Sequence, residues 1–235
     1  MATQNNRLTP HTDTTPVVVE LATELSGSQW VDRFNGSSLE SDLVDPFRTN
    51  LGNFIAAMRA AGMKVKINAT YRPDKRAFLM HFSGKVANGA IAPKDVPTYA
   101  AHKVTTRIAP QDMDEYAINF DIEWQHSDLA KSLSAAADMQ KGYKAVFPPA
   151  YPSKHTARQA VDMWITWTAT AVEKPIPHFE ITVKNADLED VIISTNIKNV
   201  DHDTAASNAV LHAVGLGFGI RKLLSDKPHW SDDGK

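Results

Sequence analysis

The chain has 235 residues, of which 43% are hydrophobic and 22% charged, and its formal net charge at pH 7 is -2. This length and composition are typical of one globular domain. The charge balance argues against nucleic-acid binding, because no basic excess is present to neutralise phosphates. The sequence has no cysteine, which excludes disulfides, thiol catalysis and zinc sites built from cysteine.

The N-terminal region shows no targeting segment. Residues 1–16 are rich in Thr, Asn and Pro, so we expect a flexible leader followed by a single domain over residues 17–235. No basic start with an apolar run marks a signal peptide, and no apolar run approaches the roughly 18 residues of a membrane span. We therefore expect a protein made in the cytoplasm, without membrane insertion. If its substrate lies outside the cytoplasm, another system must export the protein.

The first half of the chain predicts helices packed on a sheet. The apolar segment within residues 17–25 fits a strand or a helical turn. Apolar residues recur at the helical period from Phe47 to Gly62, which is the expected C-cap. Apolar and polar residues alternate over residues 64–71, which predicts a strand, and a second helix follows it.

The remaining elements complete an α+β pattern, with a small antiparallel sheet and helices packed on it. We expect a long connection at 84–112, strands at 116–124, 160–167 and 175–183, a helix at 129–139, a stiff aromatic and proline-rich loop at 142–152, a polar stretch at 187–203 and a last helix at 207–224. Gly215, Gly217 and Gly219 in that helix indicate close packing, because no strand precedes them as in a dinucleotide-binding motif.

Two segments concentrate the residue types that metal-dependent catalysis requires. The first runs from Ser153 to Asp162 and contains His155, and the second contains Asp226 and His229. Two imidazoles and one carboxylate provide the three ligands of a catalytic zinc site, and a further carboxylate is available for acid–base chemistry. An Asp in an apolar strand also needs a charged partner or a metal, because burying an unpaired carboxylate is costly.

Arg72 follows the predicted strand at 64–71 and precedes a helix, so it should lie at the rim of the sheet. It fits either a surface salt bridge or a clamp for an anion or a carbonyl oxygen. His178, His202 and His212 are expected to be structural or solvated.

Together these segments resemble the zinc peptidase family of D-Ala-D-Ala carboxypeptidases and L-alanoyl-D-glutamate endopeptidases, which includes VanY-like enzymes and phage endolysins. The family pattern is Ser-x-His-x-x-Gly-x-Ala-x-Asp, followed later by Glu or Asp, two residues, His and often Trp. Tyr71-Arg72 matches the upstream Tyr-Arg pair of the family. The similarity covers residues about 47–82, 151–167 and 215–231.

This resemblance implies the core fold of that peptidase family and a set of zinc ligands. The ligands would be His155, Asp162 and His229. The implied activity is hydrolysis of an amide bond in the stem peptide of peptidoglycan, by an endopeptidase or a carboxypeptidase. Family members without a signal peptide are typically phage lysins or antibacterial effectors injected by a secretion system, so a phage or secretion-system partner is expected.

The resemblance also implies roles for four further residues. Asp226 would take a proton from the attacking water and pass it to the leaving amine. Arg72 would stabilise the oxyanion or hold a substrate carboxylate. Ser153 would orient substrate or a ligand, and Tyr71 is expected beside it at the substrate.

Two features depart from the family. Arg158 stands where the family has Gly, a residue that often supplies a positive φ. Residues about 84–145 lengthen the separation between Arg72 and His155 and are expected to be an insertion.

Two other functions compete with the peptidase. A cell-wall-binding or phage structural protein could keep the fold and lack activity, with Arg158 and the insertion as signs of a new role. A zinc hydrolase acting on another substrate could equally use the aromatic loop at 142–152.

Overall fold

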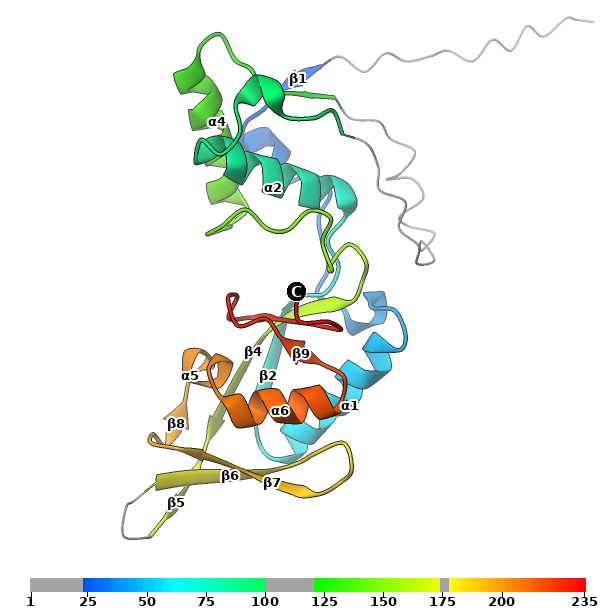
Figure 1. The fold of residues 1–235 in the computed structure, drawn as a ribbon, viewed down its shortest axis with the longest axis vertical. Helices are drawn as coiled ribbons and strands as arrows, with labels where there is room; N and C mark the ends of the chain where they lie inside the picture. The colour runs from blue at the N-terminus through cyan, green and yellow to red at the C-terminus, as the bar shows by residue number, and fades with distance from the viewer. Residues whose placement is uncertain (1–22, 100–120, 174–177) are drawn as a thin grey trace, which may run out of the picture.

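The computed structural model describes residues 23–99, 121–173 and 178–235 (Figure 1). Its α-helices are α1 (Phe47–Ala60), α2 (Asp74–Ala87), α4 (Leu129–Gly142), α5 (His202–Ala206) and α6 (Ala209–Gly217), and its 3₁₀ helices are η1 (Ser28–Trp30), η2 (Glu40–Asp42) and η3 (Pro93–Asp95). The strands are β1 (Glu24–Leu25), β2 (Lys64–Ala69), β3 (Ile122–Glu123), β4 (Ala160–Thr168), β5 (Thr170–Val172), β6 (His178–Lys184), β7 (Asp190–Thr195), β8 (Asn199–Val200), β9 (Arg221–Lys222) and β10 (His229–Ser231). No helix in these ranges is both long enough and apolar enough to span a bilayer.

The strands form small, mostly antiparallel sheets. In the five-stranded sheet, β4 pairs with β2 on one side and with β10 and β8 on the other, and β9 pairs with β10. β5, β6 and β7 form a three-stranded antiparallel sheet, and β1 pairs with β3 in parallel. The predicted α+β class, with small antiparallel sheets and packed helices, is therefore confirmed.

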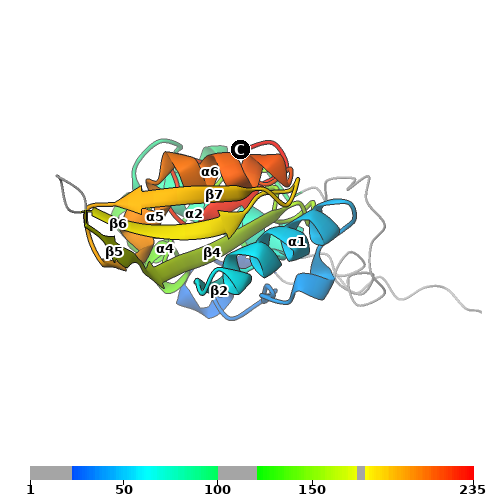
Figure 2. The same cartoon turned by 90° about the horizontal axis from the view of Figure 1, so that it is seen from below.

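The long strand β4 has one buried face and one partly open face. Successive side chains of a strand point to opposite sides, and Val161, Met163, Ile165 and Trp167 are all buried in the main hydrophobic cluster. Figure 2 shows α1, α6 and the pair β6–β7 gathered around β4, and these elements supply many of the other buried residues of that cluster. Asp162 consequently lies on the other face of the sheet.

A second hydrophobic cluster lies in the part of the molecule drawn uppermost in Figure 1. It joins α2 and α4 to η1, and its buried members include Trp30, Phe78, Trp124 and Met139. The hydroxyl of Tyr143 donates a hydrogen bond to the carbonyl oxygen of Trp30 over 3.1 Å. The segment expected as an insertion thus shares a core with elements that precede it in the chain.

The predicted elements need correction at three places. Helix α2 continues to Ala87 instead of ending before residue 84, because Val86 packs in the second cluster. The polar stretch expected at 187–203 contains strand β7, in which Ile193 is buried within a short apolar run that polar residues flank on both sides. The last helix ends at Gly217 instead of Leu224, since the chain turns through Gly219 at φ 78° into β9.

Other expectations fall partly outside the described residues. These are the leader at 1–16, most of the segment at 17–25, the first part of the strand at 116–124 and the start of the strand at 175–183. The described remainders are β1, β3 and β6.

Gly215 provides a test of packing behind the sheet. A Cβ atom at Gly215 would lie 2.9 Å from the Trp230 ring and 3.0 Å from the carbonyl oxygen of Ile220. We expect Gly215→Ala to lower the free energy of unfolding by about 1–3 kcal/mol through overpacking. Gly52→Ala in α1, where no atom lies within 4 Å of the new Cβ, should instead raise it by up to about 1 kcal/mol. Urea titration of both variants checks this contrast, and equal stabilisation would contradict it.

Candidate metal centre

Strand register brings two of the predicted ligands together. His229 on β10 lies directly opposite Asp162 on β4 in the antiparallel pair. His155 comes from the turn that immediately precedes β4. The three side chains are largely buried, with exposed fractions of 2% for His155, 9% for His229 and 18% for Asp162.

The three side chains converge on one oxygen atom. His155 Nε2 and His229 Nδ1 each lie 3.2 Å from Asp162 Oδ1. The two imidazole rings meet edge to face with centroids 5.0 Å apart, and one ligand atom from each residue lies within 4.8 Å of the others. A metal ion can therefore contact all three residues together.

The outer nitrogens of both rings face main-chain carbonyl oxygens. His155 Nδ1 lies 3.2 Å from the Thr70 oxygen, and His229 Nε2 lies 3.0 Å from the Lys235 oxygen. A carbonyl oxygen only accepts, so each outer nitrogen must carry the proton, and a neutral ring then turns its lone pair toward Asp162. This orientation by an outer carbonyl is what metal-binding histidines commonly show.

Charge and burial favour a cation between these groups. Burial lowers the pKa of His155, which favours the neutral ring. Burial acts to raise the pKa of Asp162, but hydrogen bonds and positive charge from the His155 and His229 rings outweigh this effect and hold that pKa well below its usual range. In the neutral rings that bind a metal, those inner protons are absent and lone pairs face the carboxylate. An ionised carboxylate and inward lone pairs repel each other unless a cation lies among them. The residues therefore fit a divalent metal ion.

The turn that carries His155 is fixed by several hydrogen bonds. Ser153 Oγ accepts the His155 N–H over 3.2 Å, and the Thr156 hydroxyl donates to the Arg72 carbonyl oxygen over 3.0 Å. The Arg158 N–H donates to the carbonyl oxygen of His155 over 3.1 Å. Ser153 thus helps to fix the turn that holds His155.

Arg158 takes the backbone conformation that a glycine would favour. Its φ is 60°, in the left-handed region. Its guanidinium lies 4.4 Å from the centroid of the Tyr71 ring, and the residue is buried. The backbone of Tyr71 also pairs with that of Ser37 in an isolated antiparallel bridge. Arg158 thus holds a positive φ at the position where the resembled pattern has Gly.

Arg72 and Asp226 both lie beside the cluster. An Arg72 guanidinium nitrogen is 4.0 Å from Asp162 Oδ2, and 15% of the Arg72 side chain is exposed. Burial lowers the pKa of Arg72, whereas the carboxylates of Asp162 and Asp226 act to raise it. Asp226 is exposed in the loop between β9 and β10, and its carbonyl oxygen accepts the His229 N–H over 3.1 Å. Asp226 thus presents a solvent-accessible carboxylate whose charge acts on Arg72.

Sequence reasoning missed Lys222, which holds the loop between β9 and β10. Its ammonium group donates to the carbonyl oxygens of Leu223 at 2.6 Å, His229 at 3.1 Å and Asp226. It also lies over the Trp230 ring. Burial lowers the pKa of Lys222 to about 8, although Asp226 and Asp162 oppose this shift. No sequence signal marks Lys222, because it falls within the predicted last helix.

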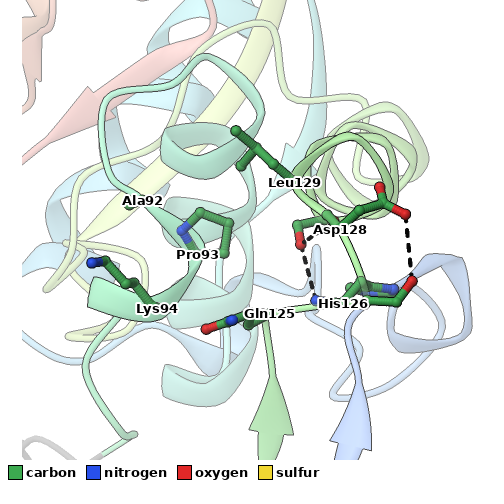
Figure 3. A pocket seen from close by; sticks show the side chains of 9 residues that line it. Ala92, Pro93, Lys94, Gln125, His126, Asp128 and Leu129 are labelled. Atoms are coloured by element: carbon green, nitrogen blue, oxygen red, sulfur yellow. Dashed lines mark hydrogen bonds between the residues drawn. The ribbon is translucent and has the colours of Figure 1, made fainter.

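A pocket elsewhere in the molecule does not include these residues. Figure 3 shows it between η3 and the start of α4, with Pro93, Lys94, His126 and Leu129 among the residues that line it. The His126 N–H donates to the Ser132 hydroxyl over 2.9 Å, and His126 Nε2 lies 3.0 Å from the Ser26 hydroxyl. His126 is therefore held by hydrogen bonds within the protein, and its place in the pocket needs no bound ligand to explain it.

Comparison with protein-family models, with curated proteins and with solved structures finds no match to this chain.

Metal content tests the ligand set. We expect one zinc ion per chain in the wild type after dialysis, and loss of that zinc in His155→Ala and His229→Ala, because each removes one of three ligands. His178→Ala, which alters a histidine of β6 paired with Glu180, should retain it. Inductively coupled plasma mass spectrometry measures the ratio, and retention of zinc in both ligand variants would exclude this site.

Lys222 gives a second prediction for the same region. We expect Lys222→Met to lower the free energy of unfolding by about 1–3 kcal/mol, because three carbonyl groups lose a shared donor, and to weaken zinc binding. Lys227 lies in the same loop as Asp226, and Lys227→Met removes only its exposed ion pair with Asp203 of α5. This variant should lower the free energy of unfolding by less than about 1 kcal/mol. Urea titration and competition with a zinc chelator measure the two effects. Equal results for the two variants would show that Lys222 has no special role.

Proposed function

We propose that this protein is a zinc-dependent peptidase that hydrolyses an amide bond in the stem peptide of peptidoglycan. The observation that carries the proposal is the buried His155–Asp162–His229 cluster, whose ring nitrogens are turned inward by main-chain carbonyl groups. The resemblance of the surrounding segments to the D-Ala-D-Ala carboxypeptidase and L-alanoyl-D-glutamate endopeptidase family supplies the substrate class.

Zinc suits this donor set. Two imidazole nitrogens and one carboxylate oxygen are ligands that zinc accepts in catalytic sites, where a further position stays open. When bound, zinc supplies a Lewis acid that makes water a competent nucleophile near neutral pH.

The residues around the cluster can complete the hydrolysis. Asp226 can accept a proton from water as its oxygen forms a bond to the carbonyl carbon. When the carbon–nitrogen bond breaks, the same carboxyl group returns that proton to the leaving amine. Arg72 can hold the negative charge that develops on the carbonyl oxygen, because its guanidinium is already kept at the cluster beside Asp162.

The proposed place of action is the bacterial cell wall. A phage lysin released at the end of infection and an antibacterial effector injected by a secretion system both use this chemistry. The proposal covers internal cleavage and removal of a terminal residue alike, because both reactions break an amide bond of the same peptide.

Substitution of Asp226 separates catalysis from metal binding. We expect Asp226→Asn to keep one zinc per chain and to lower the rate of peptidoglycan cleavage by about 10²–10⁴-fold, the usual contribution of a general acid–base group. Asp187→Asn, at an exposed position between β6 and β7, should leave the rate unchanged. Mass spectrometry of digested purified peptidoglycan identifies the bond that is cut.

The same digest distinguishes the alternatives. A zinc-loaded wild type that releases no fragments would overturn the proposal and favour a wall-binding protein or a hydrolase of another substrate. Full activity in Asp226→Asn would remove Asp226 from the mechanism.

A further inference from the structure

The face of the sheet that carries Asp162 extends away from the metal ligands. Trp164 and Thr166 follow Asp162 on this face of β4 and are partly exposed. On the neighbouring strand β2, Lys66 pairs in register with Trp164, and Lys64 pairs with Thr166. The result is a surface of aromatic and basic side chains continuous with the metal centre.

Helix α5 borders this surface on the side opposite β2. The rings of His202, the first residue of α5, and Trp164 have centroids 4.3 Å apart. We use the name Trp164 platform for Lys64, Lys66, Trp164, Thr166 and His202. Trp164 therefore has a lysine of β2 on one side and an imidazole on the other.

The platform carries uncompensated positive charge. Lys64 and Lys66 are both exposed, and neither forms an ion pair with a carboxylate among the described residues. The nearby Asp203 carboxylate is already paired with Lys227 over 2.9 Å, and it lies 3.7 Å from His202 Nε2. It contacts neither lysine of the platform among the described residues. An anionic group placed over Trp164 would thus meet two free ammonium groups.

The spacing along β4 relates the platform to the bond being cut. Two residues along a strand cover about 7 Å, so Trp164 lies about that far from Asp162. A bound peptide in an extended conformation advances by a similar amount over two of its own residues. In a peptide that runs along β4, a substrate group about two residues from the cleaved bond therefore comes beside Trp164 and Lys66.

We propose that the Trp164 platform binds an acidic part of the peptide substrate, with Lys66 and Lys64 pairing with a free carboxylate and Trp164 packing on the adjacent peptide. This inference rests on the proposed peptidase function and specifies its substrate. Charge complementarity supports it, because stem peptides of peptidoglycan carry free carboxylates on D-glutamate and, where present, on diaminopimelate. Amidation of those carboxylates removes the charge that the lysines would recognise.

The experiment compares two stem peptides with the zinc-loaded full chain. One peptide has free side carboxylates and the other has them amidated. For the acidic peptide we expect KM to rise about threefold in Lys66→Gln and about tenfold when Lys64→Gln is added, with kcat little changed, because a partly exposed ion pair is lost at each step. The amidated peptide should show unchanged KM in both variants. Lys184→Gln on β6, a lysine paired with Asp190, is the control and should alter neither peptide.

A third variant tests the aromatic part of the platform. Trp164→Ala should raise KM for both peptides, since packing on the ring does not depend on charge. Cleavage of both peptides by the wild type with equal KM, unaltered by the lysine substitutions, would overturn the platform and leave the peptidase standing. Absence of cleavage of either peptide by the wild type would instead overturn the proposed function itself.

Discussion

The carboxylate of Asp162 lies 3.2 Å from a nitrogen of both His155 and His229, and this crowded contact governs the rest of the structure. Three electron-rich atoms stay together only if the surrounding chain prevents them from moving apart. The register of β4 with β10 fixes His229, and the turn after Ser153 fixes His155. The hydrophobic core on the other face of the sheet therefore holds these three polar side chains together, although their contact by itself lowers the stability of the fold.

The attachment of β10 to the core depends on the residue that follows His229. Trp230 is buried against Phe54 of α1, with ring centroids 5.4 Å apart, and against Gly215 of α6. The side chains of His229 and Trp230 point to opposite faces of the sheet, as neighbours on a strand do. One side chain therefore anchors the strand in the hydrophobic cluster while the other reaches the metal face.

The cluster of His155, Asp162 and His229 was predictable from sequence, because its residues lie in two short segments. The helix α1 and the strands β2 and β4 were also predictable, since their apolar residues follow a clear period. Strand β7 was missed because its short apolar run, residues 191–193, lies within a mostly polar stretch, and the end of α6 was missed because the apolar pattern continues past Gly217. These errors arise where tertiary packing decides the outcome.

The contacts around the ligands could not be predicted in the same way. Lys222 donates to main-chain carbonyl groups, which every residue type has, so the sequence does not indicate which residues accept these hydrogen bonds. The main-chain oxygens that face the two histidines belong to Thr70, which lies 85 residues before His155, and to Lys235, which lies six residues after His229. Arg158 shows the converse case, because the φ of 60° persists although the expected glycine is absent. Backbone geometry is thus the part of the site that sequence describes least.

Asp162 and His229 are separated by 67 residues, and His155 lies seven residues before Asp162. A metal held by all three would join distant parts of the chain in the manner of a cross-link. A covalent bridge that closes a loop of this length reduces the entropy of the unfolded chain by an amount worth about 4 kcal/mol. In a protein without cysteine, a metal bound by these three side chains would act as a reversible cross-link. A chelator would remove it, and it would form only after the sheet has brought the three side chains together.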